Sequence, residues 1–257
     1  MELRDRTVLI TGGTSGIGLE LATTLLKRGN TVIVTGRNQD RLDAVRRQYQ
    51  GLNALRCDVS QESDIGMLYE KIAENFPSLD VLVNNAGIMR NLRLTDPKGI
   101  EDVTREIEIL LTGPIHMVQQ FLPHLMLRRG AAIINVSSGL AFIPMPISPI
   151  YCAAKAGLHS YTQSLRAQLK GTDIEVIEVA PPPVETRLFR EEFAEEMKGQ
   201  IAMTPRRLVA TMIACIEAGR TEITPGVAKV LKAASRIAPA FMFRQMIKLG
   251  QPRKSAG

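Results

Sequence analysis

The chain has 257 residues, of which 45% are hydrophobic and 23% charged, which suits a folded globular protein with a sizeable core and excludes an intrinsically disordered chain. Three widely spaced cysteines without a C-x-x-C pair exclude a disulfide-stapled miniprotein and predict reduced thiols. The N-terminus lacks the apolar stretch of a signal peptide, and no apolar run approaches the ~20 residues of a membrane span. We therefore expect a soluble, cytoplasmic protein.

The net charge of +6 is concentrated at the C-terminus. Residues 223–257 contain seven basic residues and no acidic one, so 25 of the 32 basic residues remain in the body against 26 acidic ones. A nucleic-acid-binding domain would carry basic charge across a folded face. The charge pattern therefore argues against nucleic acid as a partner.

Apolar runs rich in Val and Ile alternate with helix-like segments, which is typical of a parallel sheet covered on both faces. Strands are predicted at residues 7–11, 31–35, 53–57, 81–84, 132–137, 174–180 and 222–224. Helices are predicted at residues 17–28, 40–49, 62–76, about 99–127, 149–169 and 204–218. Seven strands and six crossovers predict one doubly wound α/β domain over residues 1–225.

Two segments depart from this alternation. Residues 187–203 are rich in Glu, Phe and Met, and we expect a substrate lid there. Residues 226–257 form a basic extension with apolar residues at helical spacing, which predicts amphipathic helices. We favour packing of these helices on the body or on another subunit, and contact with anionic lipid remains the alternative.

A glycine-rich turn connects the first strand to the first helix. Glycines permit a tight turn and close approach of a ligand, and a helix N-terminus favours a pyrophosphate. A tight turn without a ligand is the alternative reading. The residues expected to hold a dinucleotide here are Gly12, Thr14, Ser15, Gly16, Ile17 and Gly18.

The end of the second strand indicates which dinucleotide binds. It reads Arg37-Asn38 with no acidic residue, and a guanidinium suits the 2′-phosphate of NADP(H), although a solvated surface arginine is the alternative. The ends of later strands also lie where a doubly wound sheet binds ligands. They add Asp58, Val59, Asn85, Ala86 and Gly87 as candidate cofactor contacts.

Three further residues form a candidate proton-transfer site. Tyr151 and Lys155 share one face of a helix because residues i and i+4 are neighbours, and Ser138 lies thirteen positions before Tyr151. A nearby cation stabilises a phenolate, so we expect Lys155 to lower the pKa of Tyr151. The alternative is that each of these three residues has only a structural role.

Together with Asn84-Asn85-Ala86-Gly87 and the segment 181–186, these motifs resemble the classical short-chain dehydrogenase/reductases, most closely the DltE-type branch. The resemblance covers nearly the whole chain. It implies a Rossmann-type fold in which Tyr151 is general acid/base, Lys155 lowers its pKa and holds the nicotinamide ribose, and Ser138 orients a carbonyl or alcohol substrate. It also implies that the nicotinamide end of NADP(H) lies against Pro181, Val184 and Thr186.

One position departs from the family pattern. Leu110 stands where the family usually has an Asn that anchors a water in a proton relay from Lys155. Glu106, one helical turn earlier, could hold a water in its place. Because leucine neither donates nor accepts a hydrogen bond, a cofactor-binding sensor or scaffold with reduced or lost turnover is the alternative function.

The remaining expectations concern substrate and assembly. Arg90 and Arg93 could recognise an acidic group, or could be solvated. The resemblance implies a homodimer or homotetramer, and no metal site is expected. The segments bordering the nicotinamide predict a partly apolar substrate, with Met89, Leu92, Pro144, Met145, Ile147, Leu188, Phe189, Phe193 and Met197 along its path.

Overall fold

The structure is a computed structural model that describes residues 1–96, 99–194 and 201–249. Its centre is a parallel sheet of seven strands in the order β3-β2-β1-β4-β5-β6-β7, which confirms the predicted doubly wound fold. The strands are β1 (Thr7–Ile10), β2 (Thr31–Gly36), β3 (Asn53–Arg56), β4 (Leu79–Asn84), β5 (Ala131–Val136), β6 (Ile174–Val179) and β7 (Glu222–Ile223).

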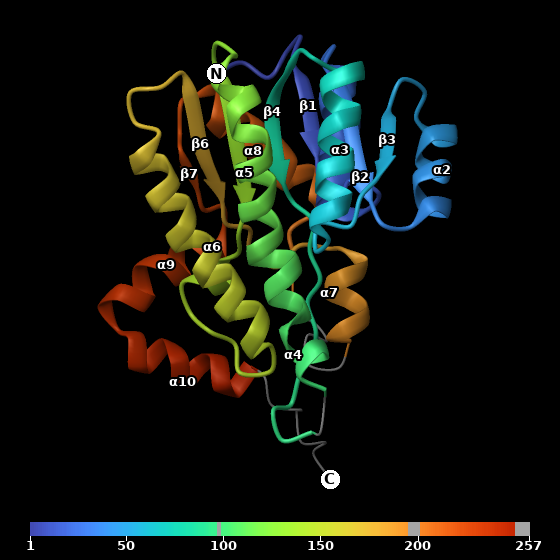
Figure 1. Cartoon of the computed structure of the whole chain (residues 1–257). Helices are drawn as coiled ribbons and strands as arrows, with labels where there is room; N and C mark the ends of the chain where they lie inside the picture. Colours follow the sequence, from blue (N-terminus) through green and yellow to red (C-terminus); the bar gives the residue numbers. More distant parts are fainter. Residues whose placement is uncertain (97–98, 195–200, 250–257) are drawn as a thin grey trace.

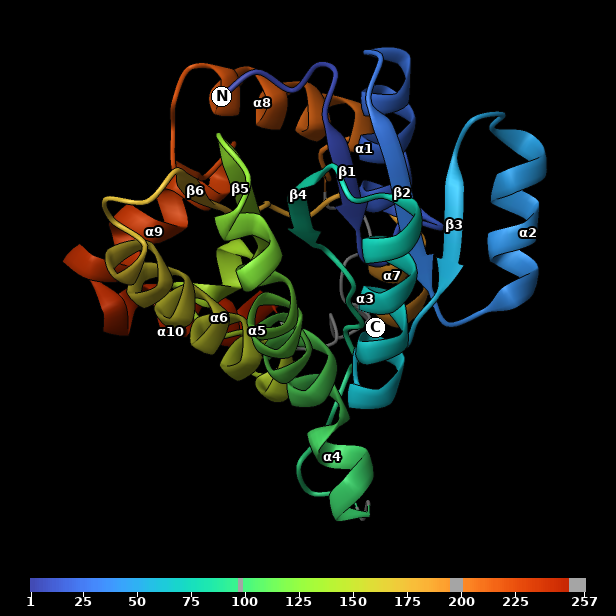
Figure 2. The same ribbon diagram turned by 45° about the horizontal axis from the view of Figure 1, so that its top comes forward.

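Helices cover both faces of the sheet (Figures 1 and 2). One face is covered by α1 (Gly16–Lys27), α2 (Gln39–Gln48) and α8 (Pro205–Glu217), and the other by α3 (Glu62–Asn75), α5 (Gly113–Met126) and α6 (Pro149–Gln168). Alternate strand residues enter the two cores, so Val8 and Ile10 pack in one cluster and Leu9 in the other.

The expected long helix at residues 99–127 is interrupted. Helix α4 (Ile100–Ile107) continues into a π-helical turn, η1 (Glu108–Thr112), before α5 begins. A π-turn widens the helix and is frequent at functional sites. The turn contains Leu110, the position where the sequence departs from the family pattern.

The carboxyl ends of the strands carry most of the remaining structure (Figure 1). Here lie the short 3-10 turn η2 (Gly139–Ala141), α7 (Arg187–Glu192), α9 (Val227–Ile237) and α10 (Pro239–Leu249). Helices α9 and α10 confirm the helices predicted in the basic extension, whose Arg253 and Lys254 lie outside the described residues. Within the described part of the chain, no helix is long and apolar enough to cross a bilayer.

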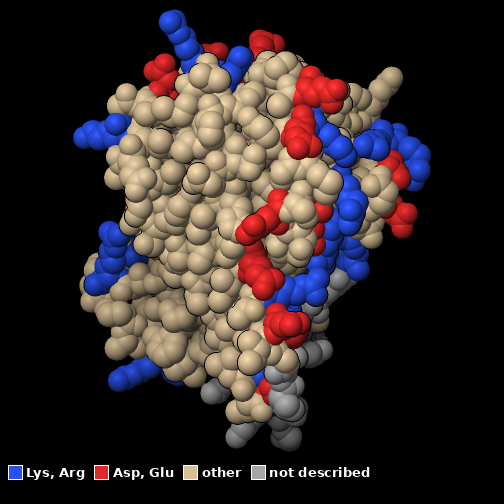
Figure 3. All heavy atoms as spheres, in the orientation of Figure 1, with Lys and Arg blue, Asp and Glu red and all other residues tan. Residues whose placement is uncertain are grey.

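Charge is distributed unevenly over the surface. In the view of Figure 3, Lys, Arg, Asp and Glu lie at the top, along the left edge and in a band down the right half, and the face between them, over α5 and α6, is largely free of them. Helix α5 contains no Lys, Arg, Asp or Glu, and in α6 the Lys155 side chain is buried while Arg166 donates to two backbone carbonyls. This uncharged face is a candidate contact surface.

Candidate functional site at the carboxyl edge of the sheet

The glycine turn approaches the loop after β4 very closely. Gly12 has a φ of +67°, and a Cβ there would lie 2.6 Å from the Ala86 Cα. Gly16 has a φ of +56° and opens α1. The Ser15 side chain makes no capping hydrogen bond, and the first turn of α1 contains no acidic residue. The helix N-terminus therefore suits an anionic group, and the turn fits a pyrophosphate.

The Asn85 loop is tied to this turn by side chains. The Thr11 hydroxyl accepts hydrogen bonds from the backbone N–H groups of Asn85 and Ala86, each at 3.0 Å. The Asn85 side chain donates to the carbonyls of Thr11 and Gly12 at 3.0 and 3.2 Å. Asn85 therefore holds the turn in shape, while Gly87 beside it is exposed.

The candidate residues at the ends of β2 and β3 differ in their surroundings. Arg37 is exposed directly after β2, and Asn38 caps α2 by accepting a hydrogen bond from the Arg41 N–H. Asp58 accepts hydrogen bonds from the backbone N–H and hydroxyl of Ser60, and Val59 is buried. Of these four candidate residues, Arg37 is the one that presents a charged side chain to solvent and neither caps a helix nor braces a turn.

Ser138 and Tyr151 meet at the carboxyl end of β5. The Ser138 hydroxyl lies close enough to the Tyr151 phenol to lower its pKa, and the Ser138 oxygen accepts a hydrogen bond from the Leu140 N–H at 3.1 Å. Burial raises the pKa of the Tyr151 phenol to about 12, the Ser138 hydrogen bond opposes this, and the nearby Glu106 carboxylate adds to it. The direction is opposite to the one expected from Lys155, because loss of hydration dominates.

Lys155 lies one turn along α6 from Tyr151. Its Nζ donates to the Val136 carbonyl at 2.7 Å and lies 5.9 Å from the centroid of the Tyr151 ring. Burial lowers the pKa of Lys155 to about 8, and the charge of Glu178 opposes that shift. The structure thus brings Ser138, Tyr151 and Lys155 together, as the sequence predicted.

The position at which the resemblance expects a proton-relay Asn is apolar in the structure. Leu110 is fully buried in the core cluster, and a Cβ on Gly87 would lie 3.2 Å from the Leu110 Cδ2. Glu106 is also fully buried, and it accepts a hydrogen bond from the Arg90 N–H at 3.0 Å. The Arg90 guanidinium lies 3.6 Å from Glu106 and 2.9 Å from Asp102. Arg90 is therefore engaged by two carboxylates of the protein itself, which disfavours the reading in which it recognises an acidic substrate.

The segment after β6 returns across the site to the glycine turn. The Pro181 carbonyl accepts from the Gly139 N–H at 2.8 Å, and Val184 is buried and bridges to Met203. A Cβ on Gly16 would lie 3.2 Å from the Thr186 Cγ2. These contacts place the 181–186 segment between the glycine turn and Ser138, where the resemblance expects the nicotinamide end.

An apolar cluster of buried residues packs against Tyr151. It includes five of the residues predicted to line the substrate path, namely Met89, Met145, Ile147, Phe189 and Phe193. Three other predicted residues are not part of the cluster: Pro144 is exposed, Leu188 is 37% exposed, and Leu92 is buried elsewhere. Met197 lies outside the residues that the structure describes. The sequence did not predict that Leu231, Met242 and Met246, from α9 and α10, would join this cluster. The sequence showed that these residues recur at helical spacing, but it did not show which part of the protein they pack against.

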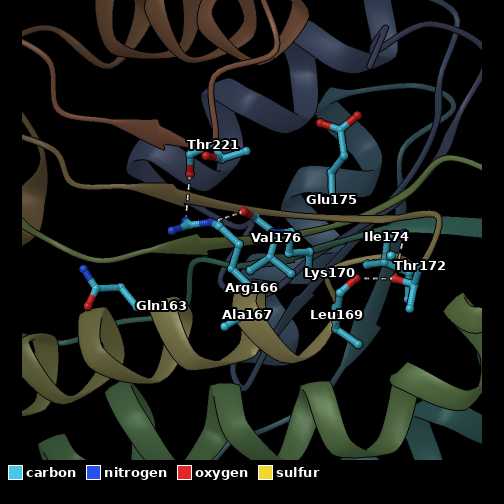
Figure 4. A pocket seen from close by; sticks show the side chains of 11 residues that line it. Gln163, Arg166, Ala167, Leu169, Lys170, Thr172, Ile174, Glu175, Val176 and Thr221 are labelled. Atoms are coloured by element: carbon cyan, nitrogen blue, oxygen red, sulfur yellow. Dashed lines mark hydrogen bonds between the residues drawn. The ribbon is translucent and has the colours of Figure 1, made fainter.

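A shallow groove at the opposite, amino end of β6 is unrelated to this site (Figure 4). It is lined by residues at the end of α6 and around β6, including Gln163, Lys170 and Thr221. Arg166 crosses it to donate to the carbonyls of Val176 and Thr221, each at 2.9 Å. The Ser138–Tyr151–Lys155 group lies at the other end of the sheet.

Comparisons with known proteins agree with this geometry. Residues 6–197 match the short chain dehydrogenase family. The chain is 41% identical over 249 residues to the Bacillus subtilis protein named uncharacterized oxidoreductase DltE, covering 96% of this chain and 98% of that one.

Two solved structures are similar in fold. A short chain dehydrogenase from Burkholderia cenocepacia in complex with NADP has a TM-score of 0.83 at 24% identity and covers 96% of this chain and 99% of its own. A 3-ketoacyl-(acyl-carrier-protein) reductase from Brucella melitensis complexed with NADH has a TM-score of 0.75 at 26% identity, with 83% and 91% covered. The family match and the DltE relative confirm the resemblance found in the motifs: the chain belongs to the short chain dehydrogenase family of oxidoreductases.

Proposed function

We propose that this protein is an NADP(H)-dependent oxidoreductase that acts on a carbonyl/alcohol pair with Tyr151 as general acid/base. The observation that carries the proposal is the placement of Ser138, Tyr151 and a buried Lys155 together, at the same edge of the sheet as the glycine turn. Bound nicotinamide would supply or accept the hydride at the substrate carbon.

The chain's own residues would handle the proton. In the direction of reduction, Tyr151 donates a proton to the substrate oxygen, and Ser138 orients that oxygen by a hydrogen bond. Lys155 holds the ribose and places a positive charge near the phenol, which favours the phenolate left after proton transfer. The apolar cluster with Met89 and Met145 excludes water and supports a partly apolar substrate.

The preference for NADP(H) rests on Arg37. It stands exposed at the end of β2, and no acidic residue occupies the position that would accept hydrogen bonds from an unphosphorylated ribose. Similar solved structures include complexes with NADP and with NADH or NAD, so nicotinamide nucleotides as a class are supported by the comparisons, and Arg37 supports the choice between them.

A spectrophotometric screen tests the function. NADPH and NADH oxidation would be followed at neutral pH with a panel of ketones and aldehydes that includes apolar members. Turnover with NADPH that exceeds turnover with NADH is the expected result. Tight NADPH binding without oxidation across the panel would instead favour the sensor or scaffold alternative, which the apolar Leu110 motivates.

We also infer a homodimer or homotetramer built on the uncharged face over α5 and α6 (Figure 3). Exposed residues on this face include Ala156 and Gln119, and charged side chains are generally depleted at interface cores. Sedimentation analysis of the wild type and of Ala156→Asp tests the inference, because a buried carboxylate at the contact would dissociate it. A monomeric wild type would contradict it. The cytoplasmic location stays a prediction.

Contact with anionic lipid is supported by the outer face of α9 and α10. Their inner face packs on the apolar cluster through Leu231, Met242 and Met246, which fits the packing expected for this extension. The outer face leaves Ile237 85% and Phe241 59% exposed. The exposed basic residues on the same two helices are Lys229, Arg236, Arg244 and Lys248. This combination of apolar and basic residues is typical of interfacial helices.

A further inference from the structure

We propose that Glu178 is the counter-charge of Lys155, a positioning residue that keeps the Lys155 ammonium charged within the buried site. The proposal rests on the proposed function for the role of Lys155, and it adds a residue from β6 that the motifs do not contain. Neither Glu178 nor its partner His159 belongs to the cofactor or substrate contacts described above.

Glu178 is a fully buried carboxylate with both oxygens occupied. The Ser137 hydroxyl donates to its Oε1 at 2.5 Å, and the His159 Nδ1 lies 2.7 Å from its Oε2. Burying a carboxylate is costly unless it is hydrogen-bonded and its charge is compensated. The two hydrogen bonds satisfy its oxygens, and its charge is compensated by the cations near it, which are Lys155 and, when protonated, His159.

The topology brings Lys155 to this carboxylate. Glu178 pairs in register with Asn135, so it lies one position from Val136, whose carbonyl accepts the Lys155 hydrogen bond at 2.7 Å. Lys155 and His159 are one turn apart on α6, on the same helix face. Lys155 is 5% exposed, and the Glu178 charge raises its pKa against the lowering caused by burial.

The other ionisable groups around Lys155 do not replace Glu178. On α6, burial raises the pKa of Tyr151 to about 12 and that of Cys152 to about 11, so neither becomes an anion between pH 6.5 and 9.5. On α4, the Glu106 carboxylate acts on Tyr151 and Cys152 and faces the Arg90 guanidinium. Glu178 is therefore the carboxylate placed to favour the charged form of Lys155.

The Glu178 charge extends the pH range in which Lys155 stays protonated. The pKa of Lys155 is about 8 with Glu178 present. Without the carboxylate, burial would be unopposed, and Lys155 would lose its proton closer to neutral pH. The positive charge that favours the Tyr151 phenolate would then be missing at the pH where the proposed reaction operates.

A double-mutant cycle tests the proposal without any enzyme assay. Unfolding of the wild type, Glu178→Gln, Lys155→Met and the double variant would be measured in denaturant at pH 6.5 and pH 9.5. We expect the pair to stabilise the fold by about tenfold in the unfolding equilibrium at pH 6.5 and by less than about twofold at pH 9.5, where Lys155 is neutral. Equal coupling at both pH values, or none at pH 6.5, would overturn the proposal.

A matched control and a rescue test separate this role from a structural one. Glu175→Gln removes a carboxylate from the same strand that is 38% exposed, and it should show no coupling to Lys155. If Glu178→Gln alone does not fold, the double variant with Lys155→Met is expected to fold, because the uncompensated ammonium is gone. If the double variant also fails to fold, the role of Glu178 is to hold His159 in place, and the counter-charge role is contradicted.

Activity provides a separate readout. In Glu178→Gln, the loss of kcat/KM with rising pH is expected to shift by about one pH unit toward acid, as Lys155 loses its proton earlier. An unchanged pH profile in an active variant would contradict the catalytic part of the proposal. A wild type without turnover would refute the proposed function, whereas the unfolding cycle would still decide the role of Glu178.

Discussion

Leu110 packs directly behind Gly87, with its Cδ2 only 3.2 Å from the position that a Gly87 Cβ would take. The contact joins the π-turn before α5 to the loop after β4, and Leu110 is fully buried. An apolar side chain therefore fills the position at which the family resemblance expects a polar residue that serves proton supply. A polar substitution of Leu110 should therefore change the stability and the activity of the protein in opposite directions.

Leu110→Asn is expected to lower stability and to raise the turnover rate per folded molecule. Loss of a buried leucine and burial of an amide cost about 2–5 kcal/mol of unfolding free energy, and the amide restores a group able to bind a water. Chemical denaturation and kcat measure the two effects. Leu111→Asn is the matched control, because Leu111 packs against Gly157 instead. An unchanged kcat would mean that proton supply is not limiting.

Tyr151→Phe should abolish turnover and leave NADPH binding nearly intact. The change removes only the hydroxyl that meets Ser138, so the rate should fall by about 10²–10⁴-fold while the dissociation constant from fluorescence titration stays within a few fold. Tyr161→Phe, a half-buried position on the same helix, controls for general effects of losing a phenol. Substantial activity in Tyr151→Phe would remove Tyr151 from the mechanism.

Lys155→Met should gain stability relative to the wild type as the pH falls toward neutral. Burial depresses the folded-state pKa of Lys155 from 10.5 to about 8. The wild type therefore loses stability as pH falls from 10.5 to 8, and below pH 8 the cost is roughly 3 kcal/mol. The unfolding free energy of the variant minus that of the wild type should be highest below pH 8 and should be lower at pH 9.5, as measured by denaturant unfolding. A pH-independent difference would indicate packing rather than charge.

Arg37→Ala should narrow the preference for NADPH over NADH. A guanidinium bound to a 2′-phosphate contributes about 1.5–3 kcal/mol, so NADPH affinity should fall about ten- to a hundredfold while NADH affinity changes little. Isothermal titration with both nucleotides measures this. Arg47→Ala, an exposed position at the far end of α2, is the control. Equal loss of affinity for both cofactors would reject the 2′-phosphate role.

Vesicle binding should depend on the outer face of α9 and α10. We expect salt-sensitive co-sedimentation with phosphatidylserine vesicles, because each basic residue near an anionic surface contributes about 1 kcal/mol. Deletion of both helices would also remove Met242 and Met246 from the apolar cluster, so substitution to Gln is the sharper test. The residues to change together are Lys229, Arg236, Arg244 and Lys248. Absence of wild-type binding at low salt would exclude lipid contact.

Local patterns in the sequence were sufficient to predict the fold and to name the residues at the core of the candidate site. Strand and helix periodicity placed all seven strands, because burial on both faces selects unbroken apolar runs. The glycine turn is encoded locally, since Gly12 and Gly16 adopt positive φ values. Tyr151 and Lys155 needed only helical spacing, which fixes their relative position on α6 without any distant contact.

Tertiary packing decided what surrounds these groups. It enclosed Arg90 between two carboxylates, brought Met246 from the C-terminal extension into the cluster that packs against Tyr151, and buried Glu178 next to the strand that Lys155 contacts. It also reversed the expected direction of the Tyr151 pKa. These properties depend on how much water is excluded and on which distant charges come close, and only the assembled sheet and helices determine both.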